Sequence, residues 1–192
     1  MAQDAVTDPA PAAEWVFGYG SLMWNPGFVF VERQAARLPG YHRAFCILSH
    51  HYRGTPEVPG LVLGLSAGGA CQGAAFRVAP PDWDATVAYL DERELIGYAY
   101  RPIVLPVEGA MGTVDAYTFV ADTGHPNFSG DLGVEAAAEM IMKAEGVAGL
   151  NRDYLMNTVR QLEQHGYEDA ALHALLNRVE TLTGIIDQGG GI

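Results

Sequence analysis

The segment Tyr89-Leu90-Asp91-Glu92-Arg93-Glu94-Leu95 places charged residues at the end of a stretch with helical spacing. Glu94 follows Leu90 by four residues and Val87 by seven, so the three side chains share one face of a helix. A carboxyl group that points inward from an apolar face has a raised pKa and suits general acid and base catalysis. Consecutive charges are also typical of a solvated helix end, and the spacing leaves both interpretations open.

A second segment, Phe17-Gly18-Tyr19-Gly20-Ser21-Leu22-Met23-Trp24-Asn25-Pro26, carries two glycines two positions apart. Glycine permits a sharp turn and lets a ligand approach main-chain N–H groups closely. Successive N–H groups form a concavity that binds anions, and a carboxylate fits it well. The same pattern is compatible with a tight turn that binds nothing. The features of a phosphate-binding loop and of a dinucleotide fingerprint are missing.

The loop Tyr52-Arg53-Gly54-Thr55-Pro56-Glu57-Val58-Pro59-Gly60 is rigid, because it holds two prolines and two glycines. Arg53 could bind a carboxylate through both of its terminal nitrogens. Alternatively, it could act as a structural clamp between two loops.

Other catalytic classes find little support in the sequence. Ser21 has no histidine and aspartate partners at a recognisable spacing, so no nucleophile triad is predicted. His50 and His51 are adjacent and would point to opposite faces of a strand, and no metal site is predicted. Cys46 and Cys71 are far apart and are predicted to be reduced, buried thiols.

The composition restricts the partners. The chain of 192 residues carries a formal net charge of −12, which disfavours binding to nucleic acid or to anionic lipid. No apolar stretch of membrane-spanning length and no secretory signal is visible, so a cytoplasmic location is expected. No pattern in the sequence indicates an oligomeric state.

The first half of the chain has the short apolar runs and the turns of a β structure, consistent with its 23 glycines and 11 prolines. The predicted strands span residues 14–19, 28–32, 41–48, 60–65, 70–78, 101–107 and 112–120.

Helices are predicted where the apolar period lengthens, with Asn151 as a plausible cap for the third of them. They span residues 83–94, 132–145, 151–165 and 168–181. Strands first and helices later indicate an α+β domain, and short strands with many turns suit a small mixed β-barrel with flanking helices. A single domain is expected over residues 14–185, between a flexible leader (1–13) and a loose tail (186–192).

Taken together, these segments resemble the ChaC family of γ-glutamyl cyclotransferases. The matching residues are the segment 17–26, then Arg53-Gly54-Thr55-Pro56 with Pro59-Gly60, Tyr89-Leu90 with Arg93-Glu94, and the stretch Ala144-Glu145-Gly146, Gly149-Leu150-Asn151 and Tyr154-Leu155. The resemblance implies a small barrel with flanking helices and an enzyme that cleaves glutathione to 5-oxoproline and cysteinylglycine.

The resemblance also assigns roles. It places the catalytic carboxylate at Glu94, and a carboxylate-binding cradle at the backbone of Tyr19, Gly20, Ser21 and Leu22. No metal or cofactor is expected, because the substrate's own α-amine is the nucleophile. The alternatives are a cyclotransferase for other γ-glutamyl-amino acids or γ-glutamyl-amines, and a non-catalytic binding module on the same fold.

Overall fold

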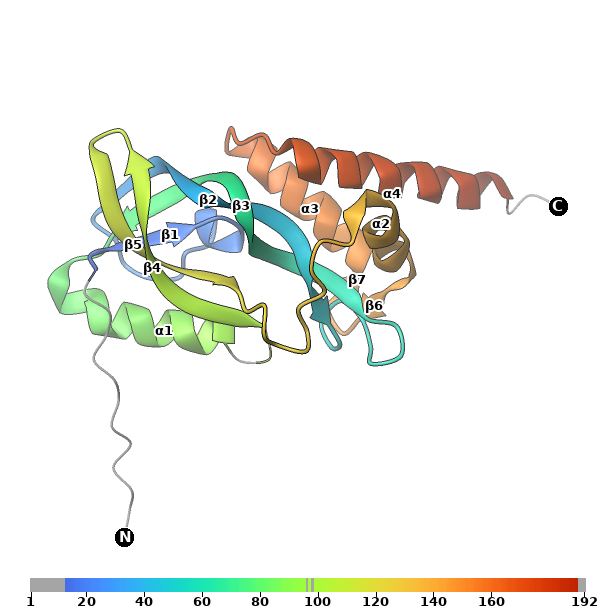
Figure 1. The fold of residues 1–192 in the computed structure, drawn as a ribbon, viewed down its shortest axis with the longest axis horizontal. Coiled ribbons are helices and arrows are strands. Elements are labelled where there is room, and N and C mark those ends of the chain that lie inside the picture. The colour runs from blue at the N-terminus through green and yellow to red at the C-terminus, as the bar shows by residue number, and fades with distance from the viewer. Residues whose placement is uncertain (1–12, 96, 98, 190–192) are drawn as a thin grey trace, which may run out of the picture.

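The protein is built around a β-barrel. The computed structural model describes residues 13–95, 97 and 99–189, and among these five strands close into a barrel in the order β1-β3-β2-β4-β5 (Figure 1). Strands β1 and β5 run parallel, and the other neighbouring pairs run antiparallel. The expected α+β class with a small mixed barrel is confirmed. The strands are β1 (Trp15–Gly18), β2 (Glu32–Ser49), β3 (Gly60–Arg77), β4 (Tyr100–Gly109) and β5 (Gly112–Ala121).

Strand β3 corrects one prediction. Residues 60–65 and 70–78 were expected to form two strands, but β3 is continuous through them. Gly68 and Gly69 lie between the two runs and have φ angles of 104° and 67°. Glycine adopts this left-handed region without strain, so the strand bends there and stays paired with β2.

The strand predicted for residues 28–32 is wrong, because β2 begins only at Glu32. The aromatic residues of this run pack against a side chain of β3 instead of pairing as a strand. The rings of Phe28 and Phe30 lie edge-on to Phe76, with centroid distances of 5.8 Å and 5.1 Å. Aromatic packing, rather than strand pairing, accounts for their hydrophobicity.

Helix α1 (Trp83–Leu95) follows a short 3₁₀ turn, η2 (Pro80–Asp82), and lies along the barrel on its own (Figure 1). Its buried residues Val87 and Leu90 belong to one apolar cluster with Val16 of β1 and Tyr117 of β5. The helix is therefore fixed against the wall of the barrel, and this contact positions its C-terminal end.

Three helices form a separate layer at another side of the barrel (Figure 1). They are α2 (Gly133–Lys143), α3 (Asn151–Gln164) and α4 (Ala170–Gly189). Ile141, Leu155 and Leu172 are buried, one from each helix, and join the main core cluster of the barrel. The predicted helices are confirmed, although α4 continues beyond the expected end at residue 181.

Asn151 does not cap α3 as expected. It is the first helical residue, and its buried side chain reaches β3 instead. Its Oδ1 accepts a hydrogen bond from the Leu61 N–H at 2.7 Å, and its Nδ2 donates to the Leu61 carbonyl at 2.8 Å. The amide side chain takes the place of a neighbouring strand, because buried backbone groups need partners.

A short hairpin connects α2 to α3, and its strands, β6 (Glu145–Gly146) and β7 (Gly149–Leu150), have two residues each. Its tip is bonded to the loop after β2, because the N–H groups of Val147 and Ala148 donate to the carbonyls of His51 and Tyr52, both at 3.0 Å. The hairpin thereby fixes one wall of the site described below.

The predicted leader lies outside the described residues, apart from Ala13. The predicted tail overlaps α4 as far as Gly189, and residues 190–192 lie outside the described part. Across the described residues, no helix is both long and apolar enough to cross a membrane.

Candidate active site

Glu94 lies in the last turn of α1 and lines a cavity of ≈ 300 Å³. Its side chain is 19% exposed. Burial raises the pKa of the Glu94 carboxyl, and the neighbouring Arg93 guanidinium lowers it in part. Of the two interpretations that the spacing with Val87 and Leu90 left open, the structure agrees with the inward-facing one, because both residues are buried and Glu94 opens into the cavity.

The glycine segment forms the adjacent wall. Strand β1 ends at Gly18, and a 3₁₀ turn, η1 (Ser21–Met23), follows. Among the described residues, the N–H groups of Gly20, Ser21 and Leu22 have no protein acceptor, whereas the next amide, of Met23, donates to the Gly20 carbonyl at 2.9 Å. Free N–H groups at the start of a helical turn are suited to an anion.

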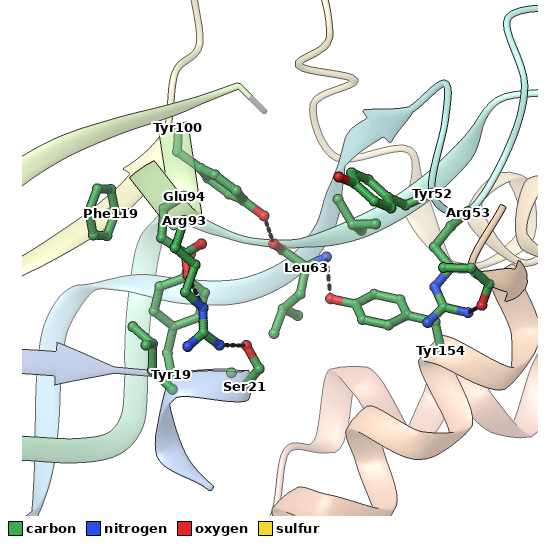
Figure 2. Close-up of a pocket in the computed structure, with 14 residues that line it drawn as sticks. Tyr19, Ser21, Tyr52, Arg53, Leu63, Arg93, Glu94, Tyr100, Phe119 and Tyr154 are labelled. Atoms are coloured by element: carbon green, nitrogen blue, oxygen red, sulfur yellow. Dashed lines mark hydrogen bonds and ion pairs between the residues drawn. The ribbon is translucent and has the colours of Figure 1, made fainter. Parts of the chain in front are cut away.

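Arg93 joins the glycine segment to the C-terminal end of α1 (Figure 2). Its Nη2 donates to Ser21 Oγ at 2.8 Å, and its Nη1 donates to the Asn25 carbonyl at 2.9 Å. Its Nε lies 3.3 Å from Glu94 Oε1. One guanidinium thus holds the carboxyl and the amide-lined wall in fixed relative positions.

Arg43 supports the same wall from behind and was not predicted. Its side chain is 1% exposed, and its Nε donates to the Tyr19 carbonyl at 2.6 Å. Its other nitrogens contact the carbonyl of Gln72 and the carboxylate of Asp169, the latter at 3.4 Å. A buried guanidinium with acceptors on several sides is a rigid anchor for the turn.

The middle of the cavity is crossed by Leu63 of β3 (Figure 2). The Tyr100 hydroxyl donates to the Leu63 carbonyl at 2.5 Å, and the Leu63 N–H lies 3.4 Å from the Tyr154 hydroxyl. Burial raises the pKa of Tyr154 and, together with the Glu94 charge, that of Tyr19. Both phenols therefore stay neutral near pH 7 and add no charge to the cavity.

Arg53 lies at the end of the cavity away from Glu94 (Figure 2). Its Nη1 donates to the carbonyls of Ala148, at 2.5 Å, and Leu150, at 3.5 Å. The guanidinium carbon is 5.2 Å from the centre of the Tyr154 ring. The clamp role considered for Arg53 thus has direct contacts, and its predicted role in binding substrate remains a prediction.

Every residue predicted for the site lines this cavity. Among the residues that line it, the chemistry-bearing ones that were not predicted are Tyr52, Arg93, Tyr100 and Tyr154. Arg93 and Tyr154 lie within the segments that carry the family resemblance, and this resemblance was the signal in the sequence that could have identified them. The predicted residues are Tyr19, Gly20, Ser21, Leu22, Arg53 and Glu94.

Asp91, Cys46 and Cys71 are not among the residues that line the cavity. Asp91 accepts a hydrogen bond from the Tyr117 hydroxyl at 2.5 Å. Both cysteines are free and buried, and burial raises the pKa of Cys46 to about 12 and that of Cys71 to about 11. Such thiols are unreactive. No group of three or more His, Cys, Asp or Glu that could hold a metal occurs within the described residues.

A comparison with models of protein families shows the family to which the chain belongs. Residues 14–182 match the model of the ChaC-like proteins. The chain belongs to the ChaC-like family. This match spans all five barrel strands and the cavity.

Two relatives of this ChaC-like protein carry names that describe an activity. The chain is 37% identical over 175 residues to the glutathione-specific γ-glutamylcyclotransferase of Escherichia coli (strain K12), covering 91% of this chain and 76% of that protein. It is 30% identical over 188 residues to glutathione-specific γ-glutamylcyclotransferase 1 of Homo sapiens, covering 94% of this chain and 85% of the human protein.

The fold has a solved counterpart. A crystal structure of a γ-glutamyl cyclotransferase specific to glutathione from yeast aligns with a TM-score of 0.77 and 22% sequence identity. The alignment covers 89% of this chain and 99% of the yeast chain. At this identity the likeness establishes the barrel with its flanking helices as the shared fold.

Proposed function

We propose that this ChaC-like protein is a glutathione-specific γ-glutamylcyclotransferase, which converts glutathione to 5-oxoproline and cysteinylglycine. The observation that carries the proposal is that one cavity holds both the largely buried carboxyl of Glu94 and the amides of Gly20, Ser21 and Leu22, which have no acceptor within the part of the chain that the structure describes. The cavity volume of ≈ 300 Å³ is at the lower end of the range for ligand pockets, which suits a small substrate.

The cradle binds the α-carboxylate of the γ-glutamyl group in this proposal. Amides of η1 donate to the carboxylate, and Arg93 and Arg43 keep the turn in place. Binding this end fixes the conformer in which the α-amine faces its own γ-carbonyl carbon. Orientation of this kind contributes up to about 7–11 kcal/mol to rate acceleration.

Glu94 transfers the protons. Its carboxylate takes a proton from the α-ammonium group, and the free amine attacks the γ-carbonyl carbon to form the new C–N bond. The bond to the cysteine nitrogen then breaks as that nitrogen receives a proton from Glu94. The ring nitrogen still carries two hydrogens after the attack, so it gives the second one to the regenerated Glu94 carboxylate, and the released amine takes up that proton as an ammonium group. One carboxyl group thus serves as base and as acid in turn, all protons are accounted for, and its raised pKa favours the exchange.

The nucleophile comes from the substrate, which explains how the site functions without a serine triad. Ser21 is part of the cradle, and its hydroxyl accepts a hydrogen bond from Arg93. Ser21 therefore contributes its position in the turn and not a covalent step.

The direct test is incubation of the purified chain with glutathione, followed by detection of both products. Equimolar 5-oxoproline and cysteinylglycine are expected. A panel of γ-glutamyl-amino acids and γ-glutamyl-amines tests the alternative substrates, and faster turnover of any of them than of glutathione would contradict the assignment. Calorimetric binding of glutathione without product would instead favour a non-catalytic binding module.

A further inference from the structure

Two arginines line the cavity, and their hydrogen bonding differs. Arg93 is fully engaged: Nη2 binds Ser21, Nη1 binds backbone carbonyls and the Tyr89 hydroxyl, and Nε lies beside Glu94. Arg53 uses Nη1 alone, and its Nε and Nη2 have no acceptor among the described residues. One guanidinium edge is therefore available to a ligand.

The position of Arg53 is fixed from several directions. Its backbone N–H donates to Ser49 Oγ at 3.0 Å. A Cβ placed on Gly60 would lie 2.0 Å from the Arg53 carbonyl oxygen, so glycine is required for this close approach. With its ring stacked beneath the guanidinium, Tyr154 restrains the side chain further. A prearranged guanidinium loses little entropy when it binds a carboxylate.

The order of the groups along the cavity corresponds to the order of the groups in a tripeptide substrate. Glu94 and Arg53 lie on opposite sides of Leu63 in the same cavity (Figure 2). With the scissile amide beside Glu94, the leaving dipeptide extends past Leu63, and two extended residues span about 7 Å. The group at its far end is a carboxylate, which an open guanidinium edge binds well.

We infer that Arg53 binds the C-terminal carboxylate of the glycine residue of glutathione and thereby selects a γ-glutamyl dipeptide over shorter γ-glutamyl compounds. The inference rests on the proposed function, because it assumes that the scissile amide lies at Glu94. It assigns Arg53 to the leaving group and not to the α-carboxylate, which the amides of η1 hold.

The test compares glutathione with its glycinamide analogue, γ-glutamylcysteinylglycinamide, which keeps the scissile bond and loses the terminal charge. Release of 5-oxoproline is measured for both. The wild-type chain is expected to favour glutathione about tenfold or more in kcat/KM. Arg53→Met keeps the side-chain length, and in this variant the ratio of kcat/KM for glutathione to that for the analogue is expected to fall close to one. Arg178→Met, in an ion pair between α4 and α2, serves as the control and should retain the preference.

Each outcome decides the matter. Equal losses with the two substrates in Arg53→Met would reduce Arg53 to a structural clamp and overturn the inference. Equal turnover of both substrates by the wild-type chain would also overturn it, while the proposed function would stand. If neither substrate gives 5-oxoproline, the proposed function fails and the inference fails with it. Arg53→Lys keeps the charge, and it should retain part of the preference even if Arg53→Met is unstable.

Discussion

Arg93 and Ser21 are 72 residues apart in sequence, and the Arg93 Nη2 donates to the Ser21 hydroxyl at 2.8 Å. The same guanidinium has its Nε 3.3 Å from the Glu94 carboxylate. The carboxyl proposed as the base and the amides proposed as the cradle for the substrate carboxylate are thus joined by one side chain. Arg93 therefore fixes the position of the Glu94 carboxyl relative to the turn that contains Ser21.

Arg93→Gln is therefore expected to lower kcat/KM for glutathione by about tenfold or more, since charge-assisted hydrogen bonds are lost. The substitution also removes the charge that lowers the pKa of Glu94. The acidic limb of the pH profile should consequently move to higher pH. A profile of kcat/KM against pH measures both effects. Arg178→Gln is the control, and an unshifted acidic limb in Arg93→Gln would contradict the proposed coupling.

Gly20→Val tests the cradle. A Cβ on Gly20 would lie 3.2 Å from Leu63 Cδ2, so the larger side chain crowds the space between the amides and the middle of the cavity. The KM for glutathione is expected to rise about tenfold, as for the loss of a charged hydrogen bond. Gly124→Val is the control, because a Cβ at that exposed position meets only the Asp122 carboxylate, at 3.5 Å. An unchanged KM in Gly20→Val would argue against the cradle.

Asn151→Ala tests the link between α3 and β3. The change leaves the N–H and carbonyl of Leu61 without their partners, and unfolding free energy should fall by about 1–3 kcal/mol. Urea denaturation measures this loss. Asn157→Ala, at an exposed site on the same helix, is the matched control and should change stability little. Equal stability of the two variants would show that the Asn151 contacts contribute nothing.

The burial of Glu94 predicts a pH-dependent gain in stability for Glu94→Gln. The folded-state pKa is raised above the ordinary value of 4.5, so the folded protein holds this proton more tightly than the unfolded chain does. Below pH 4.5 both states are protonated and Glu94 imposes no cost. As pH rises through the folded pKa, the wild type loses stability that Glu94→Gln keeps. Denaturation at pH 7 and at pH 4 should show a difference at pH 7 that diminishes at pH 4; the opposite trend would contradict the burial of the charge.

Local patterns in the sequence predicted much of the site. The spacing of Glu94 with Val87 and Leu90 indicated a shared helix face, because a helix has a fixed period, and left an inward position open beside a solvated one. The paired glycines at Gly18 and Gly20 predicted a turn with accessible amides, since glycine permits that backbone geometry.

Contacts between distant segments could not be predicted in this way. The side-chain bonds from Asn151 to Leu61 and from Arg43 to Tyr19 depend on how the layers pack, which no local pattern records. Strand β3 looked like two strands because its central glycines resemble a turn, although pairing with β2 keeps it continuous. The role of Tyr100 likewise depends on the approach of β4 to Leu63.

The central claim concerns proton transfer by Glu94, and the most direct measurement is 5-oxoproline release from glutathione by Glu94→Gln, with calorimetric binding of glutathione to the same variant. Glu92→Gln, an exposed neighbour on α1, is the control. A loss of about 10²–10⁴-fold in kcat with little change in affinity is expected, because the substitution removes the titratable group and keeps its shape. Turnover of Glu94→Gln at the rate of Glu92→Gln would contradict the account.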